Sequence, residues 1–292
     1  MTASTPRDLA ANPLPPAPPR GRRANAQLVI GAVLIGLVVA VALVSLVWTP
    51  HDPLATNAAD RLQGPSGEHP FGTDRYGRDV LSNVMAGAQV TLVVGFIAVG
   101  IAAVVGVPLG VLAAMRPGAP GIVIMRGSDI LLAFPGLLLA LVFGAVFGAG
   151  TVSAMIALGI GAIPAFARVA RSGALQVMKT DYVLAARAAN RSGFRIALRH
   201  VLPNIGGLAI VQCSVNFALA VLAEAGLSFL GLGTQPPTPS WGRMLQESQQ
   251  YLGVADHLAI APGIAIAIAV LGFNLFGDGL RDVFDPKLRR RR

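Results

Sequence analysis

Reactive and charged side chains are scarce in this chain of 292 residues, which has one cysteine, four histidines and 13% charged residues. Cys213 has no second thiol to pair with, so an intrachain disulfide is excluded. The histidines at 51, 69, 200 and 257 lie far apart and show no metal-ligand spacing. The sequence therefore predicts no metal site, and it says nothing about the redox compartment.

Nucleotide-binding and catalytic motifs are also lacking. There is no G-x-x-x-x-G-K-[ST] loop, so the chain does not hold ATP phosphates by that route. No nucleophile–base pair stands at a recognisable spacing, and the 34 glycines fit close packing of membrane helices better than ligand binding. We expect no enzymatic activity and no cofactor in this chain.

Long hydrophobic runs are what the chain does have. Hydrophobic residues make up 54% of it and the mean hydropathy is +0.64, which is too apolar for an ordinary soluble domain. Six runs approach the length of about 20 residues that crosses a bilayer. They lie at about 28–48, 88–115, 129–148, 152–170, 205–232 and 258–276. The predicted fold class is an all-α integral membrane protein with six transmembrane helices.

The first run and the segments around it suggest the organisation of the chain. Residues 1–27 are Pro-rich without apolar periodicity and are predicted to be a disordered tail. The run at 28–48 is too long for a signal peptide and no clear cleavage site follows, so it is predicted to be an uncleaved anchor. An extracytoplasmic loop is expected at 49–87, the transmembrane core at 88–280 and a basic cytoplasmic tail at 281–292.

Lys and Arg residues are unevenly divided between the two sides of this arrangement. If the N-terminus is cytoplasmic, only Arg61, Arg75, Arg78 and Arg243 lie outside, and the other 19 of the 23 lie inside. This is the asymmetry expected for inside loops, and the opposite topology would invert it. We therefore predict a plasma (inner) membrane protein with both termini in the cytoplasm. The net charge of +9 reports topology, and nucleic-acid binding is not expected.

Ionisable residues are rare within the predicted spans. Glu224 lies near the outer end of the fifth span, where a bond to a neighbouring helix is favoured over contact with a substrate amine. Gln212, Ser214 and Asn216 precede it and form a candidate substrate path. Asp129 opens the third span and is expected to cap that helix. With so few buried carboxylates, an ion-coupled transporter is poorly supported.

The polar stretch at 181–204, DYVLAARAANRSGFRIALRHVLPN, differs from the rest of the chain. Tyr182, Ala185, Ala186 and Ala189 fall on one face of a short helix, and Asn190 suits a left-handed C-cap. This small-residue face would let a partner approach the helix backbone closely. Docking of a partner is therefore one interpretation of the stretch, and a solvated loop beside anionic lipid is the other.

A second short helix is expected to follow the break at Asn190. Ser192 is predicted to cap it, residues 193–201 to form it, and Pro203 to end it before the fifth span. A break there means that the basic residues of the stretch need not share one face. These are Arg187, Arg191, Arg195 and Arg199.

The same stretch resembles the cytoplasmic coupling loop of ABC importer permeases, whose pattern is roughly E-A-A, then a glycine, and finally I-x-L-P. Ala185, Ala186 and the Leu202–Pro203 pair match that pattern. Leu184 stands where glutamate is usual, and Asn190 stands where glycine is usual. Asn190 keeps access to the left-handed conformation, whereas Leu184 removes a charge.

Further segments strengthen the resemblance, which runs from about residue 28 to the C-terminus. They are similar to the second permease subunit of the dipeptide/oligopeptide (and nickel) branch. These segments are HPFGTDRYGRDVLSNVMAGAQVTL (69–92), SDILLAFPGLLLAL (128–141), EAGLSFLGLGTQPPTPSWGRML (224–245) and GDGLRDVFDPKLRRR (277–291).

The resemblance implies a type I ABC importer transmembrane domain that translocates dipeptides or oligopeptides. It implies pairing with a homologous permease, delivery of peptide by an extracytoplasmic binding protein, and one or two ATPase subunits that bind ATP and Mg. It also implies that a coupling helix at about 181–191 docks on an ATPase. The docking residues expected are Tyr182, Ala185, Ala186, Arg187, Asn190, Leu202 and Pro203.

Two other functions remain open at this point. An importer of the same branch could carry nickel, glutathione or another small solute. A membrane scaffold or receptor subunit without a transported solute is the alternative from another class.

Two outer segments carry further expectations. The prolines of TQPPTPSWGRML preset its backbone, so that Trp241 can lie at the level of the lipid headgroups, while contact with a binding protein or peptide is an equal alternative. GTDRYGRD, at 72–79, is expected to form a capped turn that leads into the second span.

Overall fold

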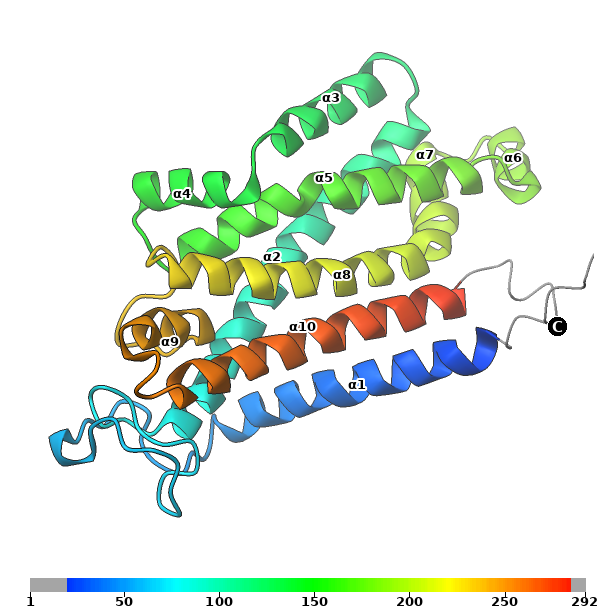
Figure 1. Ribbon diagram of the computed structural model, residues 1–292. Helices are drawn as coiled ribbons and strands as arrows, with labels where there is room; N and C mark the ends of the chain where they lie inside the picture. The colour runs from blue at the N-terminus through cyan, green and yellow to red at the C-terminus, as the bar shows by residue number, and fades with distance from the viewer. Residues whose placement is uncertain (1–19, 285–292) are drawn as a thin grey trace, which may run out of the picture.

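Helices make up the regular structure of the described residues, 20–284, in the computed structural model (Figure 1). Side chains are described from residue 26 onward. Among the described residues, Thr73 and Asp79 form an isolated β-bridge, and no extended strand is present. The ten α-helices are α1 (Arg20–Val44), α2 (Val80–Met115), α3 (Ala119–Ala133), α4 (Gly136–Phe147), α5 (Thr151–Val177), α6 (Asp181–Ala188), α7 (Gly193–Ile196), α8 (Leu202–Phe229), α9 (Trp241–Ser248) and α10 (His257–Phe284). Shorter turns are η1 (Ala58–Asp60), η2 (Ala197–Val201, a π-helical segment) and η3 (Gln249–Tyr251).

The all-α fold with multiple apolar helices is confirmed. Five helices are long and apolar enough to cross a membrane, and the number reaches six if the bent pair α3–α4 counts as one span. The segments predicted as tails, at 1–19 and 285–292, lie outside the described residues.

The third span was predicted as one helix at 129–148, and this is wrong. α3 and α4 meet at an angle of 84°. Phe134 precedes Pro135 and takes an extended backbone, with φ −85° and ψ 122°, because the proline ring disfavours a helical residue before it. Asp129 does not cap a helix either: it lies within α3, and its carboxylate accepts a hydrogen bond of 2.7 Å from Arg168 of α5.

The expectation that Pro203 ends a helix is also wrong. Helical backbone continues from α7 through the π-helical segment η2 into α8, over Gly193–Phe229. Pro203 lies in the first turn of α8, where a missing N–H is best tolerated, and the wider turns of η2 precede it. The capped turn at 72–79, by contrast, is confirmed. Asp79 is the N-cap of α2 and accepts hydrogen bonds from the backbone N–H (2.8 Å) and hydroxyl (2.6 Å) of Ser82.

Close backbone packing between α2 and α5 holds the centre of the molecule together. Gly106 and Gly110 of α2 lie directly against α5. A side chain at Gly110 would overlap the carbonyl oxygen of Ala167, and one at Gly106 would come within 2.6 Å of the Ile163 carbonyl oxygen. Such small-xxx-small contacts are how membrane helices reach short interaxial distances.

The other spans are arranged around this pair. α5, α8, α10 and α1 lie side by side, and α2 crosses them obliquely (Figure 1). Glycines again allow the close approach of α1 and α10, because a side chain at Gly31 or Gly279 would overlap the backbone of the other helix. One end of the bundle carries the loop after α1 together with α9, and the opposite end carries α6 and α7 near the start of α1 and the end of α10 (Figure 1).

The α2–α5 contact predicts a sharp difference between two glycines of α2. Gly110→Leu should lower the stability of the purified protein by at least the ~1–3 kcal/mol typical of overpacking, because the clash involves α5 backbone. Gly100→Leu is the matched control, since a side chain there meets nothing within 4 Å. Thermal unfolding in detergent measures both variants. Equal melting temperatures for the two variants would show that the α2–α5 contact does not limit the stability of the protein.

Candidate functional site

The segment between α5 and α8 rests on the ends of two long helices. Val183 of α6 is fully buried, and Ile196 of α7 is almost so. Both belong to one apolar cluster with Ala114 of α2 and Ala174 of α5. α6 and α7 are therefore packed onto the α2–α5 pair rather than suspended in a free loop.

The turn between α6 and α7 has the geometry that the sequence predicts. Asn190 has φ +54°, the left-handed region, directly after the C-cap Ala189. The Arg191 N–H donates to the Ala186 carbonyl (3.1 Å), and the Asn190 N–H donates to the Arg187 carbonyl (2.9 Å). These two bonds define a Schellman motif, which satisfies carbonyls at the helix end. Ser192 then caps α7, as predicted, by accepting from the Arg195 N–H.

The outward side of α6 combines small and apolar residues. Ala185 and Ala189 are exposed, whereas Ala186 is half-buried against the cluster below. Tyr182 is partly exposed and its ring lies 5.9 Å from that of His200. The structure thus leaves most of the predicted small face accessible.

Phe194 is a surface feature that the sequence reasoning missed. It is the second residue of α7 and its side chain is 76% exposed. Leu184 on α6, also exposed, adds a second apolar side chain to this end of the molecule. The sequence offered one sign of this exposed residue, because Phe194 stands between Arg191 and Arg195.

Three of the four arginines gather around one hollow, which the sequence did not indicate. Arg191, Arg195 and Arg199 line it together with His200, and the walls also include Ala186, Ala189 and Ile196. The break at Asn190 separates only Arg187, whose guanidinium reaches the Met178 sulfur at 3.9 Å. The hollow is a concave basic surface between α6 and α7, suited to an acidic partner group.

The two remaining residues of the predicted coupling pattern differ in burial. Leu202 packs against the cluster that holds α6 and α7, whereas Pro203 is exposed in the first turn of α8. Both lie where α8 begins, directly after the π-helical segment. Their place in docking stays a prediction.

The residues of the candidate substrate path take different partners. The Ser214 hydroxyl donates to the Phe273 carbonyl of α10 (2.6 Å). The Asn216 amide donates to the carbonyl of Gln212 on its own helix (2.9 Å). Ser214 and Asn216 are buried between helices, while Gln212 is half-exposed. A role for these residues in translocation stays a prediction.

Glu224 is 1% exposed and lies among hydroxyl groups near the C-terminal end of α8. One carboxylate oxygen accepts hydrogen bonds from Ser228 (2.7 Å), Ser240 (3.0 Å) and Thr234 (3.3 Å). Ser228 is in α8 itself, whereas Thr234 and Ser240 tie the loop after α8 back onto the helix. Contact between Glu224 and a substrate amine would require this loop to move away, so it also remains a prediction.

Trp241 does not lie at a lipid interface, and that expectation is wrong. It is 2% exposed, and its indole N–H donates to the Val84 carbonyl of α2 (2.8 Å). The first turn of α9 fits against glycine and backbone: the Trp241 ring lies over Gly87, and Gly242 abuts the backbone of Ala225. The indole is a structural anchor that fixes α9 across α2 and α8.

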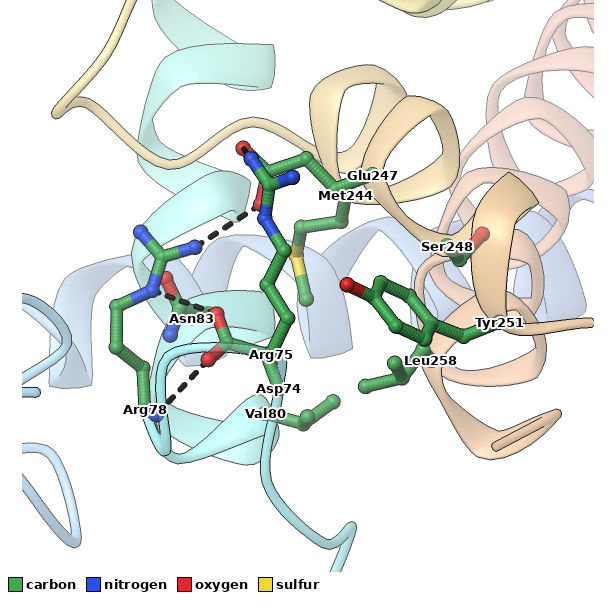
Figure 2. Close-up of a pocket in the computed structure, with 10 residues that line it drawn as sticks. All are labelled: Asp74, Arg75, Arg78, Val80, Asn83, Met244, Glu247, Ser248, Tyr251 and Leu258. Carbon is green, nitrogen blue, oxygen red and sulfur yellow. Dashed lines mark hydrogen bonds and ion pairs between the residues drawn. The ribbon is translucent and has the colours of Figure 1, made fainter. Parts of the chain in front are cut away.

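The loop between α1 and α2 is attached to α9 by an ion-pair network (Figure 2). Arg78 bonds to Asp74 (2.6 Å) within the loop and to Glu247 of α9 (3.0 Å), and Glu247 also accepts from Arg243. Figure 2 shows Arg75 beside the Glu247 carboxylate. The two groups are 3.9 Å apart. These half-buried pairs join two segments far apart in sequence into one surface.

The sequence of this chain matches a family model over residues 106–290, that of the binding-protein-dependent transport system inner membrane component. The match includes the segment from α6 to the first turn of α8, and it covers more than half of the chain. The chain belongs to this family. It is a multi-pass permease component of a transport system, and the scaffold without a transported solute is set aside.

Permeases of peptide and glutathione transport systems resemble this one over most of its length. The dipeptide transport system permease protein DppC of Alkalihalophilus pseudofirmus is 40% identical over 91% of this chain and 87% of its own. The glutathione transport system permease protein GsiD of Pectobacterium atrosepticum is 39% identical, over 89% and 87%. A putative peptide transport system permease of Brucella suis is 44% identical, over 89% and 88%.

A solved structure shows the same fold. A chain of the MetNI methionine ABC transporter, in an inward-facing conformation, matches with a TM-score of 0.58 and 20% identity. The match covers 70% of this permease and 96% of that chain. The fold is that of a type I ABC importer membrane domain.

The left-handed turn of this permease predicts how α6 responds to substitution at residue 190. Asn190→Val should destabilise the turn by ~1–2 kcal/mol, because a β-branched side chain disfavours φ +54°. Asn190→Gly should keep it. Hydrogen exchange of the Asn190 and Arg191 amides should become roughly 5- to 30-fold faster in the valine variant. Unchanged exchange in Asn190→Val would contradict the structural role of the turn.

Proposed function

We propose that this permease imports dipeptides or short oligopeptides, as one half of a pair with a homologous permease, driven by ATPase subunits that contact α6. The observation that carries the proposal is the exposed small face of α6 on a seat formed by α2 and α5. The likeness to peptide permeases at 40–44% identity supports the substrate class.

ATP binding and hydrolysis are assigned to partner subunits because the chain lacks a phosphate-binding loop. A partner that closes on α6 can shift the permease between inward- and outward-facing states only by the difference in interaction energy it delivers to them. Close contact with Ala185 and Ala189, and a charged contact with Arg191 or Arg195 in the basic hollow, would supply such a difference.

The position of α6 supports a cytoplasmic orientation for both termini. α6 and α7 lie at the same end of the bundle as the start of α1 and the end of α10 (Figure 1). Arg191, Arg195 and Arg199 are at this end, and Arg75, Arg78 and Arg243 are at the other. The plasma membrane of the cell, with the binding protein on the outer side, is the proposed location.

Two surfaces are proposed for the remaining partners. The homologous permease would cover apolar side chains that α3 and α4 leave exposed, among them Ile130, Leu138 and Val142. The binding protein would approach the outer surface formed by the loop after α1 and α9.

Glutathione is the second candidate substrate, because GsiD of Pectobacterium atrosepticum is 39% identical to this permease. Glutathione is itself a small peptide, so both candidates require a path that accepts peptide backbone. Nickel or another small solute remains an alternative within the same branch, since substrate choice lies largely in the binding protein.

Uptake of labelled dipeptide by cells lacking this chain, and complemented with variants, tests the proposal. The wild-type chain should restore uptake, and excess unlabelled dipeptide should compete better than glutathione or nickel. Ala185→Trp should reduce uptake by about tenfold or more, which corresponds to ~1.4 kcal/mol of lost coupling. The reason is that a bulky side chain prevents close approach of the partner to exposed Ala185.

Ala119→Trp is the matched control, because Ala119 is exposed at the start of α3, outside the proposed dock. Amounts of each variant in the membrane are compared by immunoblot. Full uptake with Ala185→Trp would refute the dock while leaving the transport function intact. Restoration of glutathione or nickel uptake, but not of dipeptide uptake, would refute the substrate.

A further inference from the structure

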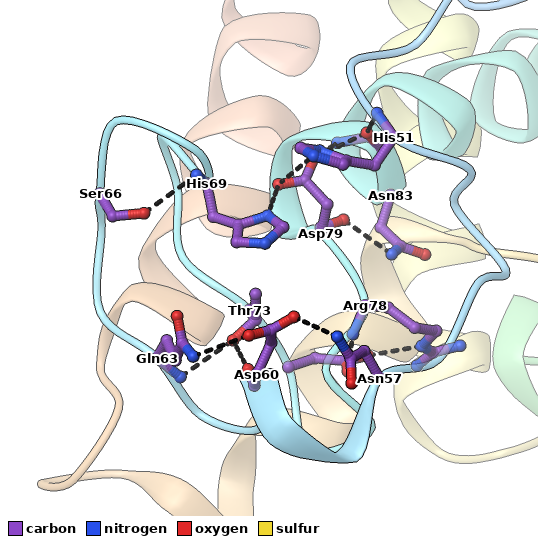
Figure 3. A network of polar contacts seen from close by, with 12 residues as sticks. His51, Asn57, Asp60, Gln63, Ser66, His69, Thr73, Arg78, Asp79 and Asn83 are labelled. Carbon is purple, nitrogen blue, oxygen red and sulfur yellow. Dashed lines mark hydrogen bonds and ion pairs between the residues drawn. The ribbon is translucent and has the colours of Figure 1, made fainter.

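Two histidines and an aspartate from separate parts of the outer loop meet at the start of α2 (Figure 3). His51 follows α1, His69 lies in the middle of the loop, and Asp79 is the N-cap of α2. Figure 3 shows both imidazole rings directed toward the Asp79 carboxylate. Their spacing in the sequence gave no sign of this cluster.

The separations within the cluster are those of ligands around one ion. His69 Nδ1 lies 3.0 Å, and His51 Nδ1 3.8 Å, from Oδ1 of Asp79. One ligand atom from each residue lies within 4.8 Å of the other two. Two ligands at about 2.0–2.1 Å from zinc are ~3.3 Å apart at a tetrahedral angle, so small side-chain shifts would close the site.

Each member of the cluster is held by other contacts. The His51 backbone N–H donates to Ser82 Oγ (3.0 Å), and the His69 backbone N–H donates to Ser66 Oγ (3.0 Å). Asp79 uses Oδ2 for the helix cap, which leaves Oδ1 directed at the histidines. Burial raises the pKa of Asp79, but hydrogen bonds from Ser82 and His69 and the nearby His51 hold it below its usual range.

The His51 ring nitrogen is the observation that a helix cap alone does not explain. Nδ1 of His51 is inaccessible to solvent and has no hydrogen-bond partner among the described residues. A hydrogen bond from His69 to Asp79 accounts for those two residues, yet it leaves this polar atom unsatisfied at 3.8 Å from the carboxylate. Buried polar atoms normally have a partner, and a bound ion would be one.

We propose that His51, His69 and Asp79 bind one divalent transition-metal ion of the zinc class. Two imidazole nitrogens and one carboxylate oxygen are a donor set that zinc accepts, whereas calcium and magnesium prefer oxygen donors throughout. The hydrogen bonds of Ser82 to Asp79 provide the outer support that ligating carboxylates usually have. In a tetrahedral site the fourth position would be left to water.

The bound ion would join three points of the outer loop to the first turn of α2. Metal binding of this kind stabilises a folded segment because the unfolded chain holds no preformed site. The role is structural and is independent of which solute the permease carries. The ion would hold this loop, which Arg78 connects to α9, in one conformation.

Titration with Co²⁺ and Zn²⁺ tests the site on the full-length chain, purified with the subunits that accompany it and treated with a chelator. The wild type should bind about one Co²⁺ per chain with the visible absorption of a tetrahedral site, and Zn²⁺ should displace it. His51→Ala should lower the affinity by at least about tenfold. It should leave the metal-free protein folded, because His51 Nδ1 has no hydrogen bond to lose.

His257→Ala is the matched control, since it removes an imidazole from the same outer region, where its Nε2 lies 3.5 Å from the Thr73 carbonyl oxygen. It should bind Co²⁺ like the wild type. Zn²⁺ should also raise the melting temperature of the wild type and of His257→Ala, but not of His51→Ala. Absence of Co²⁺ binding to the wild type, or equal binding by His51→Ala, would overturn the proposal. These measurements do not use an uptake assay. Failure of the metal-site proposal can therefore be distinguished from failure of the proposed transport function.

Discussion

The backbone contact between α2 and α5 is the constraint on which the rest of the structure depends. Gly106 and Gly110 bring the two helices together without intervening side chains. Without a hydrophobic driving force between helices in lipid, such close packing is what holds a bundle together. At the end of this pair that carries α6 and α7, Ala114 and Ala174 form the seat of those two helices.

In the proposed function, this seat is how a chain without a phosphate-binding loop would respond to ATPase partners. The buried Val183 attaches α6 to the α2–α5 pair, and the Schellman turn at Asn190 fixes the C-terminal end of α6. Force on the exposed face of α6 would therefore reach α2 and α5 directly. At the opposite end of the bundle, Trp241 anchors α9 to α2, so that the segments at both ends of the bundle are attached to the same helix.

Local patterns predicted much of this structure, and contacts between distant segments account for what they missed. Spans, the capped turn at 72–79 and the left-handed Asn190 follow from hydropathy, turn residues and backbone preference. The 84° bend at Pro135 was missed because proline within a span is compatible with a straight or a bent helix. The burial of Trp241 and the proximity of His51 to His69 arise from segments that meet only in the folded chain. No spacing in the sequence indicates these contacts.

Distances between spin labels at residue 188 of α6 and residue 104 of α2 test the central claim, that α6 moves as one body with the α2–α5 pair. Both positions are exposed, and replacing Cys213, the single cysteine, leaves only the introduced labels. The account predicts one unchanged distance distribution in the assembled importer with and without ATP. A distribution that shifts or broadens with ATP would show that α6 is hinged, and would contradict it.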